Sequence, residues 1–404
     1  MAKRIAPLFL TLLNDLLGAG IVLTIFAPLV LGTDDFFSIK SSYHIHALVL
    51  GLLIGAYPFG QLFGAPLMQE FAKNLGRKNI LLISILFGFL AFLLSGVAIY
   101  THMLWLMFVS RLIAGFFSSN RTLAQSAILE LATPKNQKFL LLMTTFFIGL
   151  GFVLGPFLGG KLSEPSLVSW FDFDVPFILV AFLFLVDFFW IFFAFKETHI
   201  VPVKKEYRFK ERFVGIFNIY KEKQIGLLFA IFFILNVGSL VFISFFPAFL
   251  LEIYKYKQGL IGDMMGYYAF FFVIGPILFH KLFIHLKPEK LLVWPLIFFA
   301  VGVYGITFFT EHWLAWVLLP IIGMSNSIYW TAIFILFAKY SPPQIRGNVF
   351  GIAWGTWSLA YFLSTAFSGI LLAHGAKIPL IFGALVTILG ALMYLLFFKT
   401  RKTA

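Results

Sequence analysis

The chain of 404 residues contains no cysteine, and only 12% of its residues are charged. Without cysteine it can form no disulfide, no thiolate metal site and no thiol nucleophile. The sequence also lacks a phosphate-cradling Gly-Lys-Ser/Thr loop, a His-Glu-x-x-His zinc motif and a nucleophile elbow. We therefore expect neither an enzyme nor an ATP-driven pump, and we expect no cofactor and no metal site.

Apolar residues, in contrast, are in large excess. They make up 61% of the chain and include 55 phenylalanines, more than a soluble core of this size can bury. Apolar stretches of about 20 residues predict membrane-spanning helices. Twelve such spans are expected, at residues 5–31, 43–70, 79–100, 103–131, 137–161, 174–196, 224–251, 260–283, 288–309, 312–339, 343–373 and 376–398.

The distribution of Lys and Arg predicts how these spans are oriented. With the N-terminus in the cytoplasm, the inner segments carry 23 of the 30 Lys and Arg and the outer loops carry five, as the positive-inside rule requires. The net charge of +13 then reflects topology and the lipid bilayer rather than nucleic acid. Short loops favour a bacterial inner membrane. We expect both termini to be cytoplasmic, the first span to be retained and the protein to be a monomer.

A long, charged inner segment divides the spans into two sets of six. The predicted domains are an N-terminal bundle at 1–196, a cytoplasmic linker at 197–223 and a C-terminal bundle at 224–404. A weak internal repeat supports this division, because a shift of 208 residues places Gly115 on Gly323 and Pro134 on Pro342. Repeated bundles of this kind are typical of transporters whose sites lie near the middle of the membrane.

The fifth span is rich in glycine. Gly151, Gly155 and Gly159 are four residues apart, which lets a neighbouring helix approach almost to backbone contact. Pro156 removes one helical hydrogen bond and bends the span, and Gly160 follows directly after Gly159. The sequences of the fourth and fifth spans resemble two motifs of the drug/proton antiporter branch of the major facilitator superfamily. The resemblance implies twelve helices in two six-helix bundles with pseudo-two-fold symmetry.

The first span carries an acidic residue about ten residues into apolar sequence. Asp15, with Gly18 and Gly20 after it, resembles the first-helix motif of tetracycline-type antiporters. A carboxyl group at this depth, near an arginine, can bind and release a proton. We expect Asp15 and Arg111 to couple proton movement to transport, and the alternative is an Asp15 contact that only locks helix packing.

The fourth span carries a stripe of polar residues that would suit a water-filled cavity. Arg111 matches the arginine of the family's fourth-helix motif, and the same face continues through Ser118, Thr122 and Gln125. Arg121 lies ten residues, hence about 280° around a continuous helix, from Arg111. Three interpretations of Arg121 stay open: it pairs with a carboxylate, reaches the inner surface or meets an anionic substrate.

The segment between the second and third spans resembles the best-known loop motif of the superfamily, with Gly64, Gly76, Arg77 and Lys78 in the matching places. It departs from the motif where the family has an acidic residue, which is Lys73 here. We expect Glu70, one turn earlier, to take the acidic role. The resemblance implies that this acid contacts a helix end of the other bundle, and the alternative is that this contact is weakened here.

These motifs predict a secondary active transporter that exports a small amphipathic molecule in exchange for protons. The alternative is a proton-coupled uptake symporter for a nutrient or metabolite. Polar and aromatic groups at mid-membrane depth are the candidates for the substrate cavity. They are Asn14, Ser118, Asn120, Arg121, Thr122, Gln125, Asn236, Asn326, Trp330, Trp354 and Trp357.

Overall fold

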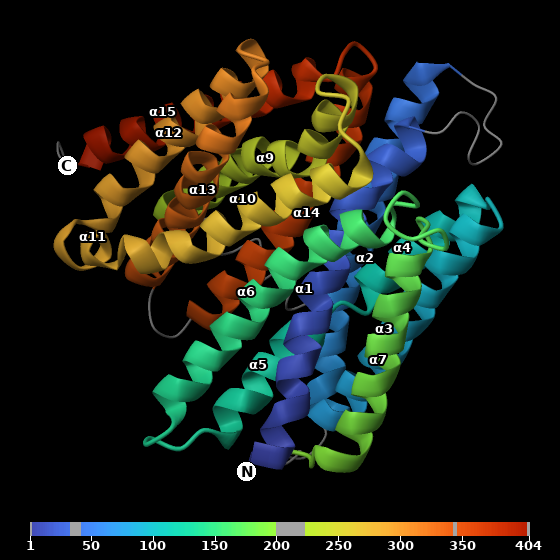
Figure 1. Cartoon of the computed structure of the whole chain (residues 1–404). Coiled ribbons are helices and arrows are strands. Elements are labelled where there is room, and N and C mark those ends of the chain that lie inside the picture. The colour runs from blue at the N-terminus through green and yellow to red at the C-terminus, as the bar shows by residue number, and fades with distance from the viewer. Residues whose placement is uncertain (1, 33–41, 199–222, 342–345, 402–404) are drawn as a thin grey trace. The chain divides into compact units, whose positions relative to one another are not determined.

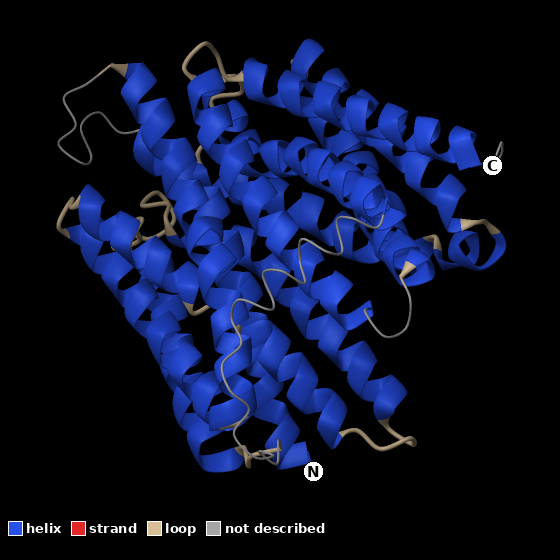
Figure 2. Ribbon diagram, turned by 180° about the vertical axis from the view of Figure 1, so that it is seen from behind, coloured by secondary structure: helices blue, strands red, loops and turns tan. Residues whose placement is uncertain are grey.

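The computed structural model describes residues 2–32, 42–198, 223–341 and 346–401. Within these ranges the regular elements are all α-helices, joined by short loops and turns (Figure 2). Eleven of the described helices are long and apolar enough to cross a membrane. The predicted all-α membrane fold is therefore confirmed. Most of the predicted linker, 199–222, lies outside the described residues.

The chain forms two compact units, and the first contains Met1–Lys205 together with Tyr256–Gly266. Within it α1 packs mainly on α6, α2 on α4, and α3 on α7 (Figure 1). Its helices are α1 (Ala2–Leu31), α2 (Tyr43–Leu75), α3 (Arg77–Tyr100), α4 (Leu104–Phe116), α5 (Asn120–Leu131), α6 (Gln137–Leu162), α7 (Val175–Ala194) and the beginning of α10 (Gln258–Leu278).

The second unit contains Glu206–Lys255 and Tyr267–Ala404. Its core is a cluster of buried apolar side chains from several helices, among them Phe229, Phe232 and Phe337. Its helices are α9 (Lys223–Glu252), the rest of α10, α11 (His280–His285), α12 (Pro288–Phe308), α13 (His312–Tyr340), α14 (Arg346–Leu372) and α15 (Lys377–Arg401).

Each unit, taken separately, shows the same helix pairings. In the first unit, α1 packs on α6 and α7, and α3 packs on α4 and α7. In the second unit, the corresponding spans repeat this scheme: α9 packs on α14 and α15, and α12 packs on α13 and α15. The internal repeat inferred from the sequence is therefore accompanied by a repeated packing scheme.

The fourth predicted span is interrupted. It consists of α4 and α5, separated by a turn in which the Ser118 amide donates to the Gly115 carbonyl and the Ser119 amide to the Phe117 carbonyl. Neighbouring serines favour such a break because their hydroxyls compete for backbone groups. A second interruption separates α10 from α11 in the eighth predicted span, just after Pro276.

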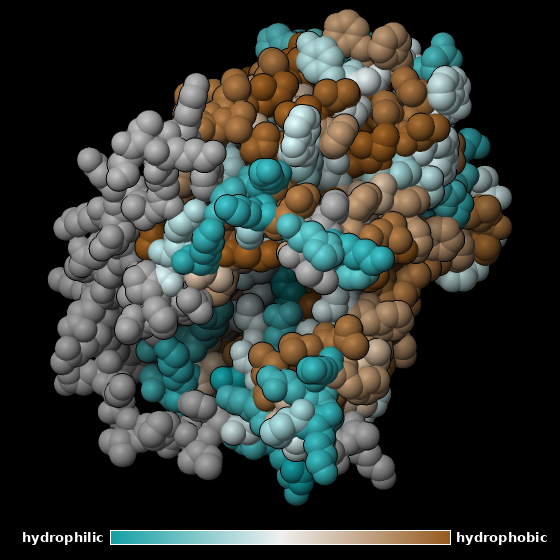
Figure 3. All heavy atoms as spheres, turned by 90° about the vertical axis from the view of Figure 1, so that its left-hand side faces the viewer, coloured by the Kyte–Doolittle hydropathy of each residue, from teal (hydrophilic) through white to brown (hydrophobic). Residues whose placement is uncertain are grey.

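Large apolar side chains are exposed on the outside of both units. Phe193 of α7 is 78% exposed, and Leu142 of α6 and Trp294 of α12 are more than 60% exposed. Brown, apolar side chains cover much of the upper and right-hand part of the face that Figure 3 displays. Exposing so much apolar surface to water would be energetically unfavourable, whereas contact with lipid tails is not. The surface is that of a multi-pass membrane protein.

Candidate functional site

In the first unit, α1 and α6 meet in a close contact that is lined by glycines. A Cβ added to Gly151 would lie 2.5 Å from the Leu13 carbonyl oxygen, and one added to Gly155 would lie 2.6 Å from the Leu17 carbonyl oxygen. Gly159 faces Ile21 in the same way, with 3.0 Å between a Cβ and the Ile21 Cα. The backbone of the helix that carries Asp15 therefore lies directly on this glycine-lined face.

Asp15 lies in a polar cluster formed by α1, α2 and α5. The positive charge that acts on its carboxyl group is that of Arg121. Tyr57 of α2 lies within electrostatic reach of Asp15, Arg121 and Arg111, with its hydroxyl near that of Ser118. Asp15, Tyr57 and Arg121 are all partly exposed. We name these four residues, Asp15, Tyr57, Ser118 and Arg121, the acid cluster.

Arg111 occupies a different environment from Arg121. It is only 1% exposed, and its guanidinium donates a hydrogen bond of 2.5 Å to the Ser95 hydroxyl of α3. The guanidinium carbon lies 4.8 Å from the centre of the Phe92 ring and 5.6 Å from that of Phe177. Its charge is thus held by aromatic faces and a hydroxyl. Arg111 ties α4 to α3 and α7, while Arg121 is the arginine that faces the acid.

The other polar residues predicted for the cavity are distributed over several environments. Asn14 is fully buried, and its amide donates to the Leu183 carbonyl of α7 at 3.2 Å. Asn120 is 3% exposed and its side-chain oxygen has no partner. Thr122 accepts a long hydrogen bond of 3.5 Å from Gln69, beside a shallow pocket between α2 and α5. Gln125, one turn further along α5, is partly exposed.

The loop between α2 and α3 is held by two glutamates. Glu197 accepts hydrogen bonds from the Arg77 amide at 3.1 Å and the Lys78 amide at 2.9 Å, which caps the N-terminus of α3. The Arg77 guanidinium forms an ion pair of 2.7 Å with Glu130. Gly76 has φ of 87°, a conformation that favours glycine. Glu70 lies 3.4 Å from Lys73 on the same helix, and Gly64 lies against the Phe116 backbone of α4.

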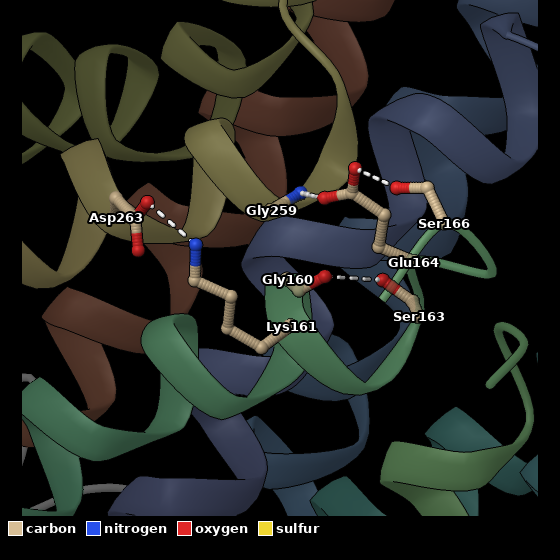
Figure 4. Close-up of polar contacts among 7 residues, drawn as sticks. All are labelled: Gly160, Lys161, Ser163, Glu164, Ser166, Gly259 and Asp263. Atoms are coloured by element: carbon tan, nitrogen blue, oxygen red, sulfur yellow. Dashed lines mark hydrogen bonds and ion pairs between the residues drawn. The ribbon is translucent and has the colours of Figure 1, made fainter. Parts of the chain in front are cut away.

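Beyond its glycine-lined face, α6 meets the beginning of α10, also in the first unit (Figure 4). The Lys161 ammonium lies 2.7 Å from the Asp263 carboxylate, and Glu164 accepts a hydrogen bond of 3.0 Å from the Gly259 amide. A Cβ on Gly160 would lie 2.8 Å from the Gly262 Cα. Gly160 therefore serves a different contact from Gly151, Gly155 and Gly159. We call this contact the α6–α10 junction.

Reversing one charge of the α6–α10 junction should lower the thermal stability of the protein in detergent. Lys161→Asp puts two carboxylates together, and because both groups are about one-third exposed we expect a cost of about 1 kcal/mol. The double variant Lys161→Asp/Asp263→Lys should regain most of that loss. Lys377→Asp, at the start of α15, controls for the change in net charge. Equal losses in the single and double variants would contradict a direct pairing.

The second unit contains an aromatic cluster on α13 and α14. Ring centres lie 6.1 Å apart for Trp330 and Trp354 and 5.8 Å apart for Trp354 and Trp357. The two predicted amides are buried in the same unit: Asn326 donates to the Tyr268 hydroxyl at 2.5 Å, and Asn236 donates to the Phe232 carbonyl at 2.7 Å. The side-chain oxygens of both amides have no hydrogen-bond partner.

Some participants were not identified from the sequence. Tyr57 of the acid cluster and Ser95, the partner of Arg111, are polar residues flanked by apolar residues within their helices, and such a pattern does not show which partner each one contacts. Asp263 and Glu164 of the α6–α10 junction gave no signal, because their partners lie about 100 residues away in the chain. The sequence signal for Tyr57 was its hydroxyl within an apolar part of the second span, next to the first span that carries Asp15.

Comparison with known proteins identifies the family. A model of the Major Facilitator Superfamily matches residues 8–283 and 228–404. The chain is 29% identical to the class H tetracycline resistance protein of Pasteurella multocida over 181 residues, which are 45% of this chain and 41% of that protein. It is 23% identical to the class E tetracycline resistance protein of Escherichia coli over 333 residues, 80% of this chain and 76% of that protein.

The fold has counterparts among solved structures. The crystal structure of a D-xylose-proton symporter aligns with a TM-score of 0.75 over 96% of both chains, at 16% identity, a likeness that shows the fold alone. The similarity to tetracycline resistance proteins confirms the resemblance predicted from the motifs in the first, fourth and fifth spans. The chain belongs to the Major Facilitator Superfamily of membrane transporters.

Proposed function

We propose that this protein exports a small amphipathic molecule in exchange for protons, by alternating access. The observation that carries the proposal is the acid cluster, in which Asp15 of a membrane-spanning helix faces the charge of Arg121. An ionisable residue within a membrane span is costly and marks an ion pathway in transporters. The tetracycline resistance proteins to which the chain is similar support the direction of transport.

Binding or release of a proton by the acid cluster can change the contacts between helices. When Asp15 is ionised, its charge attracts Arg121, and this attraction holds α1 to α5. When Asp15 is protonated, the attraction is lost and the Tyr57 hydroxyl remains nearby as a neutral partner. Because α1 rests on the glycine-lined face of α6, with no side chain between their backbones, the change at Asp15 is passed to α6.

The aromatic cluster supports an amphipathic substrate. Trp330, Trp354 and Trp357 offer flat apolar faces, and the free oxygens of Asn236 and Asn326 in the same unit can accept hydrogen bonds. Ligand sites of this type combine apolar walls with a few polar groups that fix orientation. A planar compound with both apolar and hydrogen-bonding parts fits this chemistry.

The proposed function is tested with purified protein in liposomes across which a pH gradient is imposed. Candidate substrates are added while the internal pH is followed with an entrapped dye. Substrate-dependent proton movement opposite to the substrate flux is the expected result. Movement in the same direction would make the protein an uptake symporter, and the absence of any proton movement with a transported substrate would overturn proton coupling.

The proposed location is a bacterial inner membrane, with a monomeric protein whose termini are both cytoplasmic. The chain lacks cysteine, so single-cysteine variants report orientation without background. We expect Leu167→Cys, in the exposed segment after α6, to react with a membrane-impermeant maleimide added to intact cells. Lys135→Cys, in the exposed segment between α5 and α6, should react only after the membrane is opened. The reverse pattern would invert the proposed topology.

A further inference from the structure

The first unit contains a second intramembrane acid that the acid cluster does not involve. Asp187 of α7 is 0% exposed, and neither of its carboxyl oxygens has a hydrogen-bond partner. An ionised carboxylate in such surroundings would cost several kcal/mol, because burial removes the hydration that stabilises its charge. A buried acid retained under these conditions needs an explanation other than packing.

Charged groups on the helices packed against α7 are engaged elsewhere or lie at helix ends. Arg111 of α4, which lies over the Phe177 ring of α7, donates its hydrogen bond to the Ser95 hydroxyl of α3. On α3, Arg77 pairs with Glu130, and the Lys78 ammonium donates to the Phe192 carbonyl at 2.8 Å, more than one turn beyond Asp187. On α6, Lys161 pairs with Asp263. On α1, Asp15 faces Arg121. The remaining titratable groups described on these helices, Arg4, Tyr100 and Lys138, lie in the terminal turns.

The neighbour of Asp187 is a hydroxyl whose hydrogen is already used. Thr11 of α1 lies against the Asp187 carboxyl group, and its hydroxyl donates to the Pro7 carbonyl at 3.2 Å. A hydroxyl has a single hydrogen, so only the oxygen lone pairs of Thr11 are left for Asp187. A protonated acid can donate to that oxygen, whereas a carboxylate cannot. The arrangement in the structure therefore suits the protonated form of Asp187.

Other unpartnered polar atoms lie at the same depth. The Asn14 side-chain oxygen, on the helix face that meets α7 at Leu183, has no partner. The Ser84 hydroxyl of α3 is fully buried and also has none. Gly88 of α3 packs on the Phe184 ring, so the antiparallel register of the two helices places Ser84 and Asp187 at a similar level. Thr11, Asn14, Ser84 and Asp187 form what we call the α7 polar niche.

We propose that Asp187 is a second proton-binding site of the transport cycle and that Thr11 reports its proton load to α1. This inference rests on the proposed function, because it assumes that protons drive transport. In the protonated state Asp187 donates to Thr11, and Thr11 donates to Pro7. When the proton leaves, the Thr11 hydroxyl turns from Pro7 to the carboxylate. Thr11 is one helical turn from Asp15, so both proton sites act on the same helix.

The test is infrared difference spectroscopy of the purified, substrate-free protein between acid and alkaline pH, in the Asp15→Asn background. We expect a band of a protonated carboxylic acid that disappears at alkaline pH and is absent when Asp187→Asn is added. Thr11→Val should move its loss to higher pH, because the ionised acid can then no longer accept a hydrogen bond from Thr11. This second variant keeps the test informative if Asp187→Asn folds poorly.

Asp174→Asn, at the N-terminal end of α7, is the matched control. Partial burial, with Asp172 nearby, raises the pKa of Asp174, so its own band also titrates and serves as an internal standard. Its removal should leave the Asp187 band unchanged. An Asp187 band that persists at all pH values, or a difference spectrum that Asp187→Asn leaves unchanged once the Asp174 band is set aside, would overturn the inference. Neither result depends on Asp15, so failure here is distinct from failure of the proposed function.

Discussion

Asp15→Asn is expected to reduce pH-driven transport to the level of protein-free liposomes. The amide has nearly the shape of the protonated acid but cannot release a proton, so transport loses its coupling while the neutral form of the cluster is kept. Substrate binding and the thermal stability of the protein should change little, because Asp15 is partly exposed and an amide is cheaper to bury than a carboxylate. Transport with and without a pH gradient is compared in the same liposomes.

The control for Asp15→Asn is Asp172→Asn, which removes an exposed acid before α7. Unchanged pH-driven transport in Asp15→Asn would rule out Asp15 as the coupling acid. The two arginines can be separated in the same assay. Arg121→Gln should move the pH profile of transport to higher pH, because the charge that favours ionised Asp15 is removed. Arg111→Gln should instead lower stability, since it unties α4 from Ser95 and the ring of Phe92.

The sequence was sufficient to predict the all-helical membrane fold. Runs of apolar residues are long and clearly bounded, and the four-residue glycine spacing of α6 has a single geometric meaning. The position of Asp15 within the first helix could also be predicted, because it depends only on counting residues along one span. These properties are local, so they require no knowledge of how the helices are arranged.

The partners of the charged residues could not be predicted in the same way. The angle of about 280° between Arg111 and Arg121 assumes a continuous helix, but α4 ends at Phe116 and α5 begins at Asn120. The angle therefore does not apply across the turn, and the sequence alone could not show that Arg121 acts on Asp15 while Arg111 lies over the Phe92 ring.

Glu197 illustrates a second limit. It lies in the segment after α7, yet it caps the amides of Arg77 and Lys78 at the start of α3, more than 100 residues earlier. Such contacts depend on which helix ends are neighbours in space, and a single sequence does not contain this information. The departure of Lys73 from the family motif was visible in the sequence, whereas the contacts of Glu130 and Glu197 with the motif residues Arg77 and Lys78 were not.

Gly155→Leu is expected to destabilise the folded state strongly. A Cβ at this position would lie 2.6 Å from the Leu17 carbonyl oxygen and 3.0 Å from the Gly20 Cα, so α1 and α6 must separate. Overpacking of a close contact costs about 1–3 kcal/mol, and backbone atoms cannot move aside as side chains do. We expect a markedly lower midpoint of thermal unfolding in detergent, with loss of transport in whatever protein remains folded.

The matched control is Gly351→Leu in α14, because a Cβ on Gly351 meets no atom within 4 Å. Both variants add the same side chain to a helix in place of glycine, so any gain in helix propensity is shared. The difference between their unfolding midpoints therefore isolates the α1–α6 contact. Gly155→Ala should fall between wild type and Gly155→Leu. Equal midpoints for the two leucine variants would mean that α1 and α6 can separate freely, and α1 could not then pass the protonation state of Asp15 to α6.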